Sequence, residues 1–315
     1  MFEEFKNITN SEAYKKAFQD RMLLRDPSDP YKLLGNTQRD DFIPHLEKLI
    51  ASLPPKPHIF DVGAGSGEIV DLVLSKLDSA EITIEEPNSI LLDQYRKRLK
   101  AHSNLQLVVA IHKSIQDLYS HHDIVQSQDL VLAIHMIYYL SDFRSDKLAP
   151  NDDILNFVSF LYNLLSPNGT IFLVYAYQQM STGGKAAKHY FLQKDKLAYK
   201  NLDAIWSARE NLLHMADVKQ LLDARYSQSS ARIESRITHS YLYGKNLEDI
   251  AIMCIAGELG CADDEPFDAT ILDVCFRFVD EHADDIGLCV EERDCPQKGM
   301  YRCNQPQIIC TITRG

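Results

Sequence analysis

The chain has 315 residues, of which 45% are apolar and 25% are charged. This composition is ordinary for a soluble globular protein and suffices for one large domain or a domain with an insertion. The formal net charge of −12 disfavours non-specific binding to nucleic acid or to an anionic membrane. We therefore expect a small-molecule partner, and neither a nucleic acid nor a membrane.

The first residues lack the basic start and apolar middle of a secretory signal, and no apolar run is as long as a membrane span. All seven cysteines lie at or after Cys254, without CxxC spacing. This pattern favours reduced thiols over a disulfide framework or a structural zinc. The sequence thus predicts a cytoplasmic protein without a metal site.

Apolar periodicity predicts strands that alternate with helices along most of the chain. Residues 11–50 are expected to be helical, with a loop at 25–36, where proline and glycine occur. Strands are predicted at 58–62, 81–86, 105–111, 129–134, 170–177, 231–242 and 306–314. Helices are predicted after Gly67, at 89–102, 152–165 and 214–226, and as a pair within 245–285.

Such an alternation indicates a parallel sheet with right-handed crossovers. We expect an α/β fold with a doubly wound, Rossmann-like sheet, N-terminal helices and a helical insertion before the last strand. The predicted segments are a helical cap at 1–50, a ligand-binding core at 51–240, a helical substrate-side insertion at 241–303 and the final core strand at 304–315.

Three glycines, Gly63, Gly65 and Gly67, separate the first strand from a helix in the segment HIFDVGAGSGEIVDL, residues 58–72. Glycine permits a tight turn and a close approach of the backbone to a ligand, and a helix N-terminus favours an anionic group. The next strand ends at Glu85 and Glu86, where a carboxylate can accept both hydroxyls of a ribose.

Two ligand classes and one structural alternative fit this turn. Nicotinamide and flavin dinucleotides usually go with G-x-G-x-x-G, whereas this chain has G-x-G-x-G, with Asp61 two residues before the first glycine. That form is more usual for S-adenosylmethionine, whose carboxylate and ammonium groups meet the turn and the nearby acidic side chain. A tight turn without a ligand is the alternative, which the acidic strand end disfavours.

The strand at 129–134 continues into a polar and aromatic stretch, IHMIYYL. Ligands of open α/β sheets bind beyond the carboxyl ends of the strands, so Ile134 and His135 are expected to face the reaction zone. His135 either orients or deprotonates a substrate group, or is a half-buried histidine with satisfied hydrogen bonds. Tyr138 and Tyr139 are either walls of a pocket or ordinary packing residues.

The sequence resembles class I S-adenosylmethionine-dependent methyltransferases and, within them, histamine N-methyltransferase. The segments that carry the resemblance are DVGAGSGEI, EEPNSILLDQYRK, HKSIQDLY, HMIYYLSD and NQPQIICTI. The resemblance implies a Rossmann-like methyltransferase sheet and S-adenosyl-L-methionine as cofactor. Within the cofactor site it implies that Gly63 approaches the methionine part, that Glu86 holds the ribose, and that Gln116 and Ile134 lie near the adenine or support the cofactor.

For the substrate, the resemblance implies that Tyr14 and Phe18 cap the pocket, that Tyr138 and Tyr139 form its floor, and that Asn304 contacts the acceptor. An aromatic box of this kind would suit a cationic or aromatic acceptor.

The chain departs from the family in several places. His135 stands where the family has a glutamine that touches the substrate, and Leu91 where it has an amide that contacts the cofactor. Asp26 and Asp29 are the nearest candidates for the family's substrate-binding glutamate. Cofactor and reaction class survive these changes, whereas histamine as the substrate stays open.

The expected chemistry is in-line transfer of a methyl group, for which the protein holds the reacting atoms collinear in a dry pocket. An amine attacks only when neutral, and His135, or a carboxylate through water, would take its proton. The leading hypothesis is a small-molecule N-methyltransferase. The alternatives are an O- or protein-directed methyltransferase and a cofactor-binding scaffold without transfer activity.

Two acidic stretches, 261–273 and 280–294, fall in the predicted insertion. They are either a solvated surface or an attractant for a cationic substrate or protein partner. Of the two, the sequence favours the solvated surface.

Overall fold

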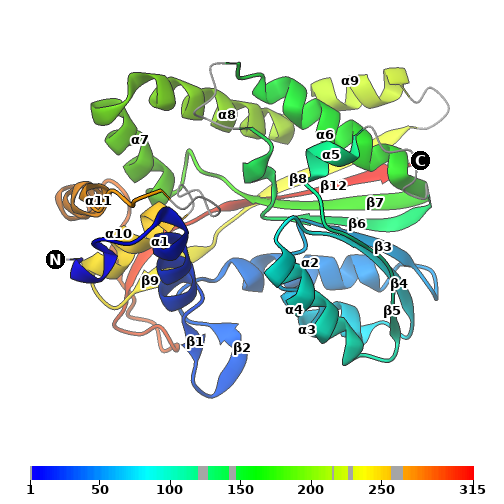
Figure 1. The fold of residues 1–315 in the computed structure, drawn as a ribbon, viewed down its shortest axis with the longest axis horizontal. Helices are drawn as coiled ribbons and strands as arrows, with labels where there is room; N and C mark the ends of the chain where they lie inside the picture. Colours follow the sequence, from blue (N-terminus) through cyan, green and yellow to red (C-terminus); the bar gives the residue numbers. More distant parts are fainter. Residues whose placement is uncertain (1, 120–126, 142–146, 215, 226–229, 257–264) are drawn as a thin grey trace. The chain divides into compact units, whose positions relative to one another are not determined.

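The computed structural model of the protein describes residues 2–119, 127–141, 147–214, 216–225, 230–256 and 265–315 (Figure 1). The chain folds into two compact units, each assembled from three segments. Unit 1 comprises Met1–Asp41, Ala176–Asp203 and Thr238–Gln307, and unit 2 comprises Phe42–Tyr175, Ala204–Ile237 and Ile308–Gly315.

Unit 2 is built on a seven-stranded sheet with the strand order β5-β4-β3-β6-β7-β12-β8. Strand β3 pairs in parallel with β4 and with β6, and parallel pairing continues to β5 on one side and to β7 on the other. The strands are β3 (His58–Val62), β4 (Ala80–Glu85), β5 (Leu105–Ile111), β6 (Gln128–Ile134), β7 (Leu165–Ala176), β8 (Ala231–Thr238) and β12 (Gln307–Arg314). The doubly wound α/β sheet predicted from the sequence is thereby confirmed.

The sheet grows in both directions from its centre, so its topological switch point lies between β3 and β6. Val62 at the end of β3 pairs with Ala133 near the end of β6, which brings the carboxyl ends of the two strands level. Open α/β sheets bind ligands in the crevice outside such a point. The topology therefore places the glycine turn and His135 at the end of the sheet where a ligand is expected.

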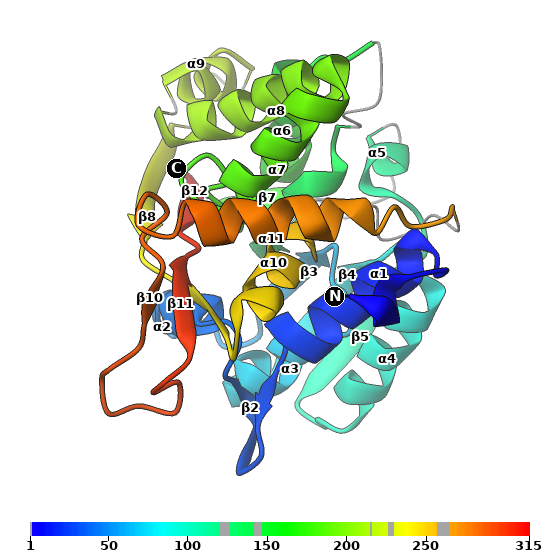
Figure 2. The ribbon, with the colours of Figure 1, turned by 90° about the vertical axis from the view of Figure 1, so that its left-hand side faces the viewer.

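Helices cover both faces of this sheet: Figures 1 and 2 show α3 and α4 on one face and α6 on the other. Leu92, Tyr95 and Leu99, at helical spacing on α4, are buried in one apolar core with Ile82 and Ile84 of β4. The helical elements are α3 (Glu68–Leu72), η3 (Leu74–Lys76), α4 (Ser89–Lys100), α5 (Ile115–Leu118), η4 (Ile137–Tyr139), α6 (Pro150–Leu164) and α9 (Ala216–Arg225). The helices α2 (Gln38–Ile50) and α8 (Lys196–His214) are each divided between the two units.

Unit 1 is organised around α10 (Leu247–Ala256), a helix whose residues 250–255 are all buried and which packs against α1, α7 and α11. A helix that is apolar on all sides belongs in the interior of a unit. Its other helical elements are η1 (Glu3–Phe5), α1 (Asn10–Ala17), the π-helical η2 (Phe18–Met22), α7 (Thr182–Lys194) and α11 (Thr270–Glu281). Two small sheets complete it: β1 (Arg25–Asp26) with β2 (Asp29–Leu33), and β10 (Cys289–Val290), β11 (Tyr301–Asn304) and β9 (Tyr241–Gly244).

The structure differs from the sequence prediction at four places. Residues 231–242, expected to be one strand, are divided between β8 of the seven-stranded sheet and β9 of a three-stranded sheet. Residues 25–36, expected to be a loop, contain the hairpin of β1 and β2, and the insertion contains the three-stranded sheet besides its two predicted helices. Helices α7 and α8 were not predicted. Glycine lowers helix propensity at Gly183, but close packing compensates, because a Cβ there would lie 3.2 Å from the carbonyl oxygen of Cys254.

The boundaries of the two compact units differ from those of the four predicted segments. The four segments therefore remain a prediction. In the part of the chain that the structure describes, no helix combines the length and apolarity of a membrane crossing.

Candidate functional site

The turn between β3 and α3 holds three glycines in the left-handed region, with φ of 60° at Gly63, 58° at Gly65 and 76° at Gly67. A Cβ at Gly63 would lie 2.5 Å from Cβ of Met136, and one at Gly67 would lie 2.7 Å from the ring of Tyr95. A Cβ at Gly65 would meet nothing within 4 Å. Gly63 and Gly67 therefore serve the packing of the turn, whereas Gly65 borders open space that a ligand can enter.

Two carboxylates at the end of β4 hold this turn. Oε2 of Glu85 accepts the N–H of Gly63 at 2.9 Å, and Oε2 of Glu86 accepts the N–H of Gly65 at 2.8 Å. The second oxygen of Glu86 accepts the N–H of Asn88 at 2.8 Å. A carboxylate oxygen has two lone pairs, so each oxygen of Glu86 can accept one further hydrogen bond.

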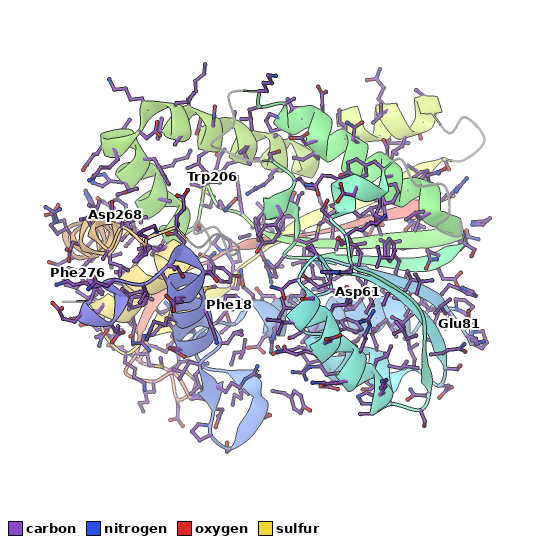
Figure 3. The ribbon with its side chains drawn as sticks, in the orientation of Figure 1. Phe18, Asp61, Glu81, Trp206, Asp268 and Phe276 are labelled. Carbon is purple, nitrogen blue, oxygen red and sulfur yellow. The ribbon has the colours of Figure 1, made fainter. Side chains whose placement is uncertain are left out.

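Asp61, which lies in β3 and is labelled in Figure 3, supports the turn through a tyrosine. Its Oδ2 accepts the hydroxyl of Tyr95 at 2.9 Å, and both residues are buried. The same tyrosine ring is the surface against which Gly67 packs. The sequence pointed to Asp61 but gave no signal for Tyr95, since an aromatic residue on an amphipathic helix resembles any other core residue.

The three acidic side chains share a buried environment that opposes their ionisation. Burial raises the pKa of Asp61 to about 7, with the Tyr95 hydrogen bond opposing the rise and the charge of Glu86 adding to it. Burial also raises the pKa of Glu85 to about 7, against the hydrogen bond from Gly63. The pKa of Glu86 is raised by burial as well, against hydrogen bonds from Asn88 and Gly65. A cationic group placed beside them would relieve this cost.

His135, at the end of β6, has an uncommon backbone conformation that needs support from its neighbours. Its φ is 55°, in the left-handed region, which is uncommon outside glycine and is tolerated by histidine and asparagine. Its N–H donates to the carbonyl of Val174 at 2.8 Å, and its Nδ1 lies 3.0 Å from the hydroxyl of Tyr138. Ile134, directly before it, is half-buried. The backbone hydrogen bond supports this conformation of His135, and the contact with Tyr138 orients the imidazole.

Two further contacts shape the aromatic stretch after His135. The guanidinium of Arg209, on α8, lies 5.2 Å from the ring centroid of Tyr138 and donates to the carbonyl of Tyr138 at 3.3 Å. Nε2 of Gln116 donates to the carbonyl of Tyr139 at 2.8 Å. Arg209 is buried, and no sequence signal marked it, because it lies on a helix that was not predicted. Tyr139 is 54% exposed, so it can border a site at the surface.

All predicted cofactor residues belong to unit 2, as do His135, Tyr138 and Tyr139, which are the predicted catalytic residues at the end of β6. The predicted substrate residues Tyr14, Phe18 and Asn304 belong to unit 1. The rings of Tyr14 and Phe18 stack at 5.5 Å with an interplanar angle of 8°, and Asn304 is exposed at the end of β11. Their place in a substrate pocket stays a prediction.

Several residues of the two acidic stretches have internal partners. Oδ1 of Asp268 accepts the N–H and the hydroxyl of Thr270, and buried Glu291 accepts from Arg293 and Arg302. These contacts favour a structural role for both acids, and residues 261–264 of the first stretch lie outside the described residues. The described residues hold no group of three or more potential metal ligands.

Comparison with known proteins finds a methyltransferase family model that matches part of unit 2. Residues 60–171 match the family described as "Methyltransferase domain", and no curated protein matches the chain. A protein of Bacillus halodurans C-125 assigned as a methyltransferase superposes with a TM-score of 0.52 at 13% identity, over 87% of this chain and 98% of that one.

Two other solved structures are more distant. The YcgJ protein of Bacillus subtilis gives a TM-score of 0.48 at 12% identity, over 87% of this chain and 98% of that one. The plantazolicin methyltransferase BamL, solved with a triazolic desmethylPZN analogue and SAH, gives 0.42 at 14% identity, over 97% of each chain.

The matched residues 60–171 contain β3, the glycine turn, β4 and β6. They are similar to the methyltransferase domain family, and this match supports S-adenosyl-L-methionine as the cofactor. The superposition on the Bacillus halodurans protein agrees with the Rossmann-like methyltransferase fold.

Proposed function

We propose that the protein is an S-adenosyl-L-methionine-dependent methyltransferase that methylates an amine or ring nitrogen of a small molecule. The observation that supports this most strongly is the pairing of Gly65 with Glu86. Gly65 borders open space, its N–H is held by a carboxylate with two acceptor positions left, and both lie at the switch point of the sheet.

The residues of unit 2 fit this cofactor. Glu86 would accept the two ribose hydroxyls with its remaining lone pairs, and Gly65 would let the backbone approach. Gln116 and Ile134 would border the adenine end. The buried negative charge around Asp61 suits a ligand that carries an ammonium group and a sulfonium. When bound, the cofactor supplies a methyl group that is activated by the positive charge on its sulfur.

His135 would serve the acceptor. Its Nδ1 lies within hydrogen-bond distance of the hydroxyl of Tyr138. If Nδ1–H donates to that hydroxyl, Nε2 is the unprotonated nitrogen and can take a proton from an amine. Tyr138 would then be a positioning residue that selects the tautomer.

The same region favours an acceptor that is neutral when it reacts. The guanidinium of Arg209 already lies over the ring of Tyr138 at 5.2 Å. One face of that ring is therefore occupied by a cation, and a second cation there would be repelled. An amine that has lost its proton, or a ring nitrogen, fits this arrangement better than a permanent cation.

Calorimetric titration tests the cofactor. The wild-type protein is expected to bind S-adenosyl-L-methionine and not NAD. Gly65→Ala should lose that binding, because its methyl group would occupy the open space beside the turn. Binding of NAD without S-adenosyl-L-methionine would refute the proposal.

Incubation with isotopically labelled S-adenosyl-L-methionine and a metabolite extract tests the transfer. A small nitrogen compound is expected to gain the mass of one methyl group. Labelling of hydroxyl groups or of proteins alone would favour the O- or protein-directed alternative, and cofactor binding without any labelled product would favour a scaffold.

With an acceptor in hand, His135→Asn removes the imidazole while keeping a residue that tolerates the left-handed backbone. General-base help is typically worth about 10²–10⁴ in rate, so kcat should fall by about a hundredfold with cofactor affinity unchanged. Full turnover by this variant would exclude His135 as the base.

A further inference from the structure

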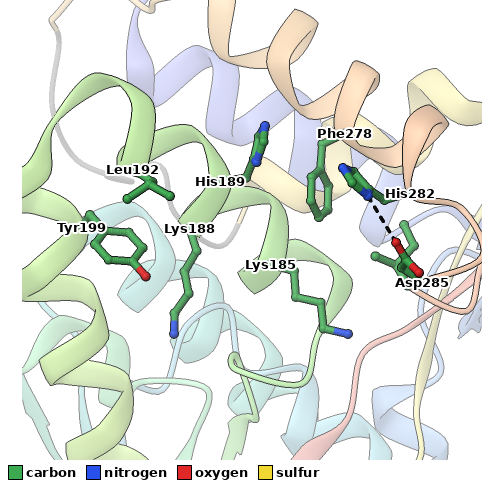
Figure 4. Close-up of a pocket in the computed structure, with 9 residues that line it drawn as sticks. Lys185, Lys188, His189, Leu192, Tyr199, Phe278, His282 and Asp285 are labelled. Carbon is green, nitrogen blue, oxygen red and sulfur yellow. Dashed lines mark hydrogen bonds and ion pairs between the residues drawn. The ribbon is translucent and has the colours of Figure 1, made fainter.

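Helices α7 and α11 of unit 1 border a pocket of about 380 Å³ (Figure 4). Small-molecule sites commonly enclose about 300–1,000 Å³, so the pocket has room for a compact ligand. All nine lining residues belong to unit 1. None of them is a residue of the proposed methyltransferase site, so the inference does not rest on the proposed function.

One wall of the pocket is a basic face of α7. Lys185, Lys188 and His189 are spaced i, i+3 and i+4, which brings them to one side of the helix. Nζ of Lys188 lies 2.5 Å from Oδ1 of Asp203, so this charge is already compensated. Within the part of the chain that the structure describes, Lys185 is half-buried and makes no ion pair. A half-buried ammonium without a counter-ion favours an anionic ligand.

The opposite wall is aromatic. Phe278 and His282 are spaced i, i+4 on α11 and its C-terminal end, with ring centroids 4.9 Å apart. The ring of His189 lies 5.1 Å from that of Phe278, so the basic and the aromatic walls meet there. Leu192 and Tyr199 add apolar surface to the lining. Such walls accept a flat apolar body.

The residues that line the pocket carry more positive than negative charge. Asp285 is the only acidic residue among the nine, it is 81% exposed, and its Oδ2 lies 3.3 Å from Nδ1 of His282. Because Lys188 is paired with Asp203 and Asp285 with His282, the ammonium of Lys185 is the excess charge of the lining, in a chain whose net charge is −12. A basic pocket on an acidic protein concentrates anions locally, whatever the sign of the total charge.

We propose that this pocket binds a small organic anion with a flat apolar body, of the aromatic carboxylate class. The carboxylate pairs with Lys185 in a charge-assisted hydrogen bond, and the ring lies against Phe278 and Leu192. An inorganic anion would leave the apolar walls exposed, and a neutral ring would leave the ammonium without a partner.

A matched pair of ligands tests the charge requirement. Titration of the full-length protein with 2-naphthoate and with its neutral analogue 2-naphthamide is followed by calorimetry. We expect the naphthoate to bind about tenfold more tightly, the order for one hydrogen bond between charged groups. Lys185→Gln should reduce the affinity for the naphthoate to that for the amide. Lys15→Gln, which makes the same charge change at an exposed position of α1, should leave both affinities unchanged.

A second variant tests the location. Leu192 is 52% exposed and lines the pocket, so Leu192→Trp can fill the space without disturbing a buried core. This variant should lose both ligands while keeping the wild-type unfolding temperature. Equal affinities for naphthoate and naphthamide, unchanged binding in Lys185→Gln, or no binding of the naphthoate at all would overturn the proposal. None of these results bears on S-adenosyl-L-methionine binding by unit 2, which is measured separately.

Discussion

The glycine turn of unit 2 and the α7–α11 pocket of unit 1 are two candidate ligand sites that differ in what forms them: backbone groups in the turn, and side chains in the pocket. In the turn, backbone N–H groups face buried carboxylates, and the shape depends on residues that have no side chain. In the pocket, side chains from two helices supply both the charge and the walls, and the charged groups are partly in contact with solvent.

The difference determines what each site tolerates. A site made by the backbone fails when a single Cβ is added, because the turn cannot move without its strands. A site made by flexible lysines tolerates most substitutions and loses only the contact that is removed. Its electrostatics are also exposed to salt, whereas buried carboxylates are screened much less.

The largest effect is expected from Gly63→Ala. The new Cβ would lie 2.5 Å from Cβ of Met136 in a backbone with φ of 60°. Left-handed strain costs about 1–2 kcal/mol, and overpacking adds about 1–3 kcal/mol. We expect the free energy of unfolding in urea to fall by about 2–5 kcal/mol, the sum of these terms.

Gly65→Ala is the matched control for this prediction, because its φ is 58° but no atom lies within 4 Å of the added Cβ. It should cost only the strain, about 1–2 kcal/mol. Equal destabilisation by the two variants would show that the contact with Met136 does not constrain the turn.

The next effect concerns binding rather than folding. Glu86→Gln keeps an acceptor for the turn but removes the charge that would hold two ribose hydroxyls. Hydrogen bonds to a charged group contribute about 1.5–3 kcal/mol, so we expect the affinity for S-adenosyl-L-methionine to fall by about tenfold to 150-fold in calorimetry. Lys185→Gln should leave this affinity unchanged. A fall of less than twofold in Glu86→Gln would mean that Glu86 only supports the turn.

The contrast between the two sites also explains which of their features could be predicted from the sequence. The turn and the acidic end of β4 were predictable, since a left-handed glycine and a strand-end carboxylate are local features of a short segment. The contact of Arg209 with Tyr138 was not, because it joins residues about seventy positions apart on elements of different type. The α7–α11 pocket was not predicted, for the same reason. In the sequence, Lys185 cannot be told from other surface lysines, nor Phe278 from other core aromatic residues, and only the fold brings the two together. Helix α7 was not predicted because Gly183 lowers its helix propensity. In the folded protein this cost is offset by close packing.

A pH series tests the burial of the acids in unit 2. The pKa of Asp61 rises from 3.8 to about 7 on folding, so between these values the folded state binds more protons than the unfolded state. The stability contributed by this group therefore falls as pH rises through that window. Asp61→Asn keeps an acceptor for Tyr95 and removes the titration.

Urea unfolding at pH 5 and pH 7.5 measures this effect. We expect the wild type, relative to Asp61→Asn, to lose about 2 kcal/mol of unfolding free energy between the two pH values. A constant difference between the two proteins across that range would show that Asp61 does not titrate there.

The smallest expected effect compares the two sites directly. The Debye length falls from roughly 10 Å at 0.1 M salt to roughly 3 Å at 1 M, so an ion pair at a half-exposed lysine is weakened while buried hydrogen bonds are not. Raising sodium chloride from about 0.1 M to about 1 M should weaken 2-naphthoate binding by a few-fold and leave 2-naphthamide unaffected. The affinity for S-adenosyl-L-methionine should change by less than the naphthoate affinity, because Glu86 is only 6% exposed. If salt lowered the affinity for the cofactor more than the affinity for the naphthoate, the buried carboxylates would have to be accessible to ions. The turn would then be the solvent-exposed site and the α7–α11 pocket the protected one, contrary to the contrast drawn above.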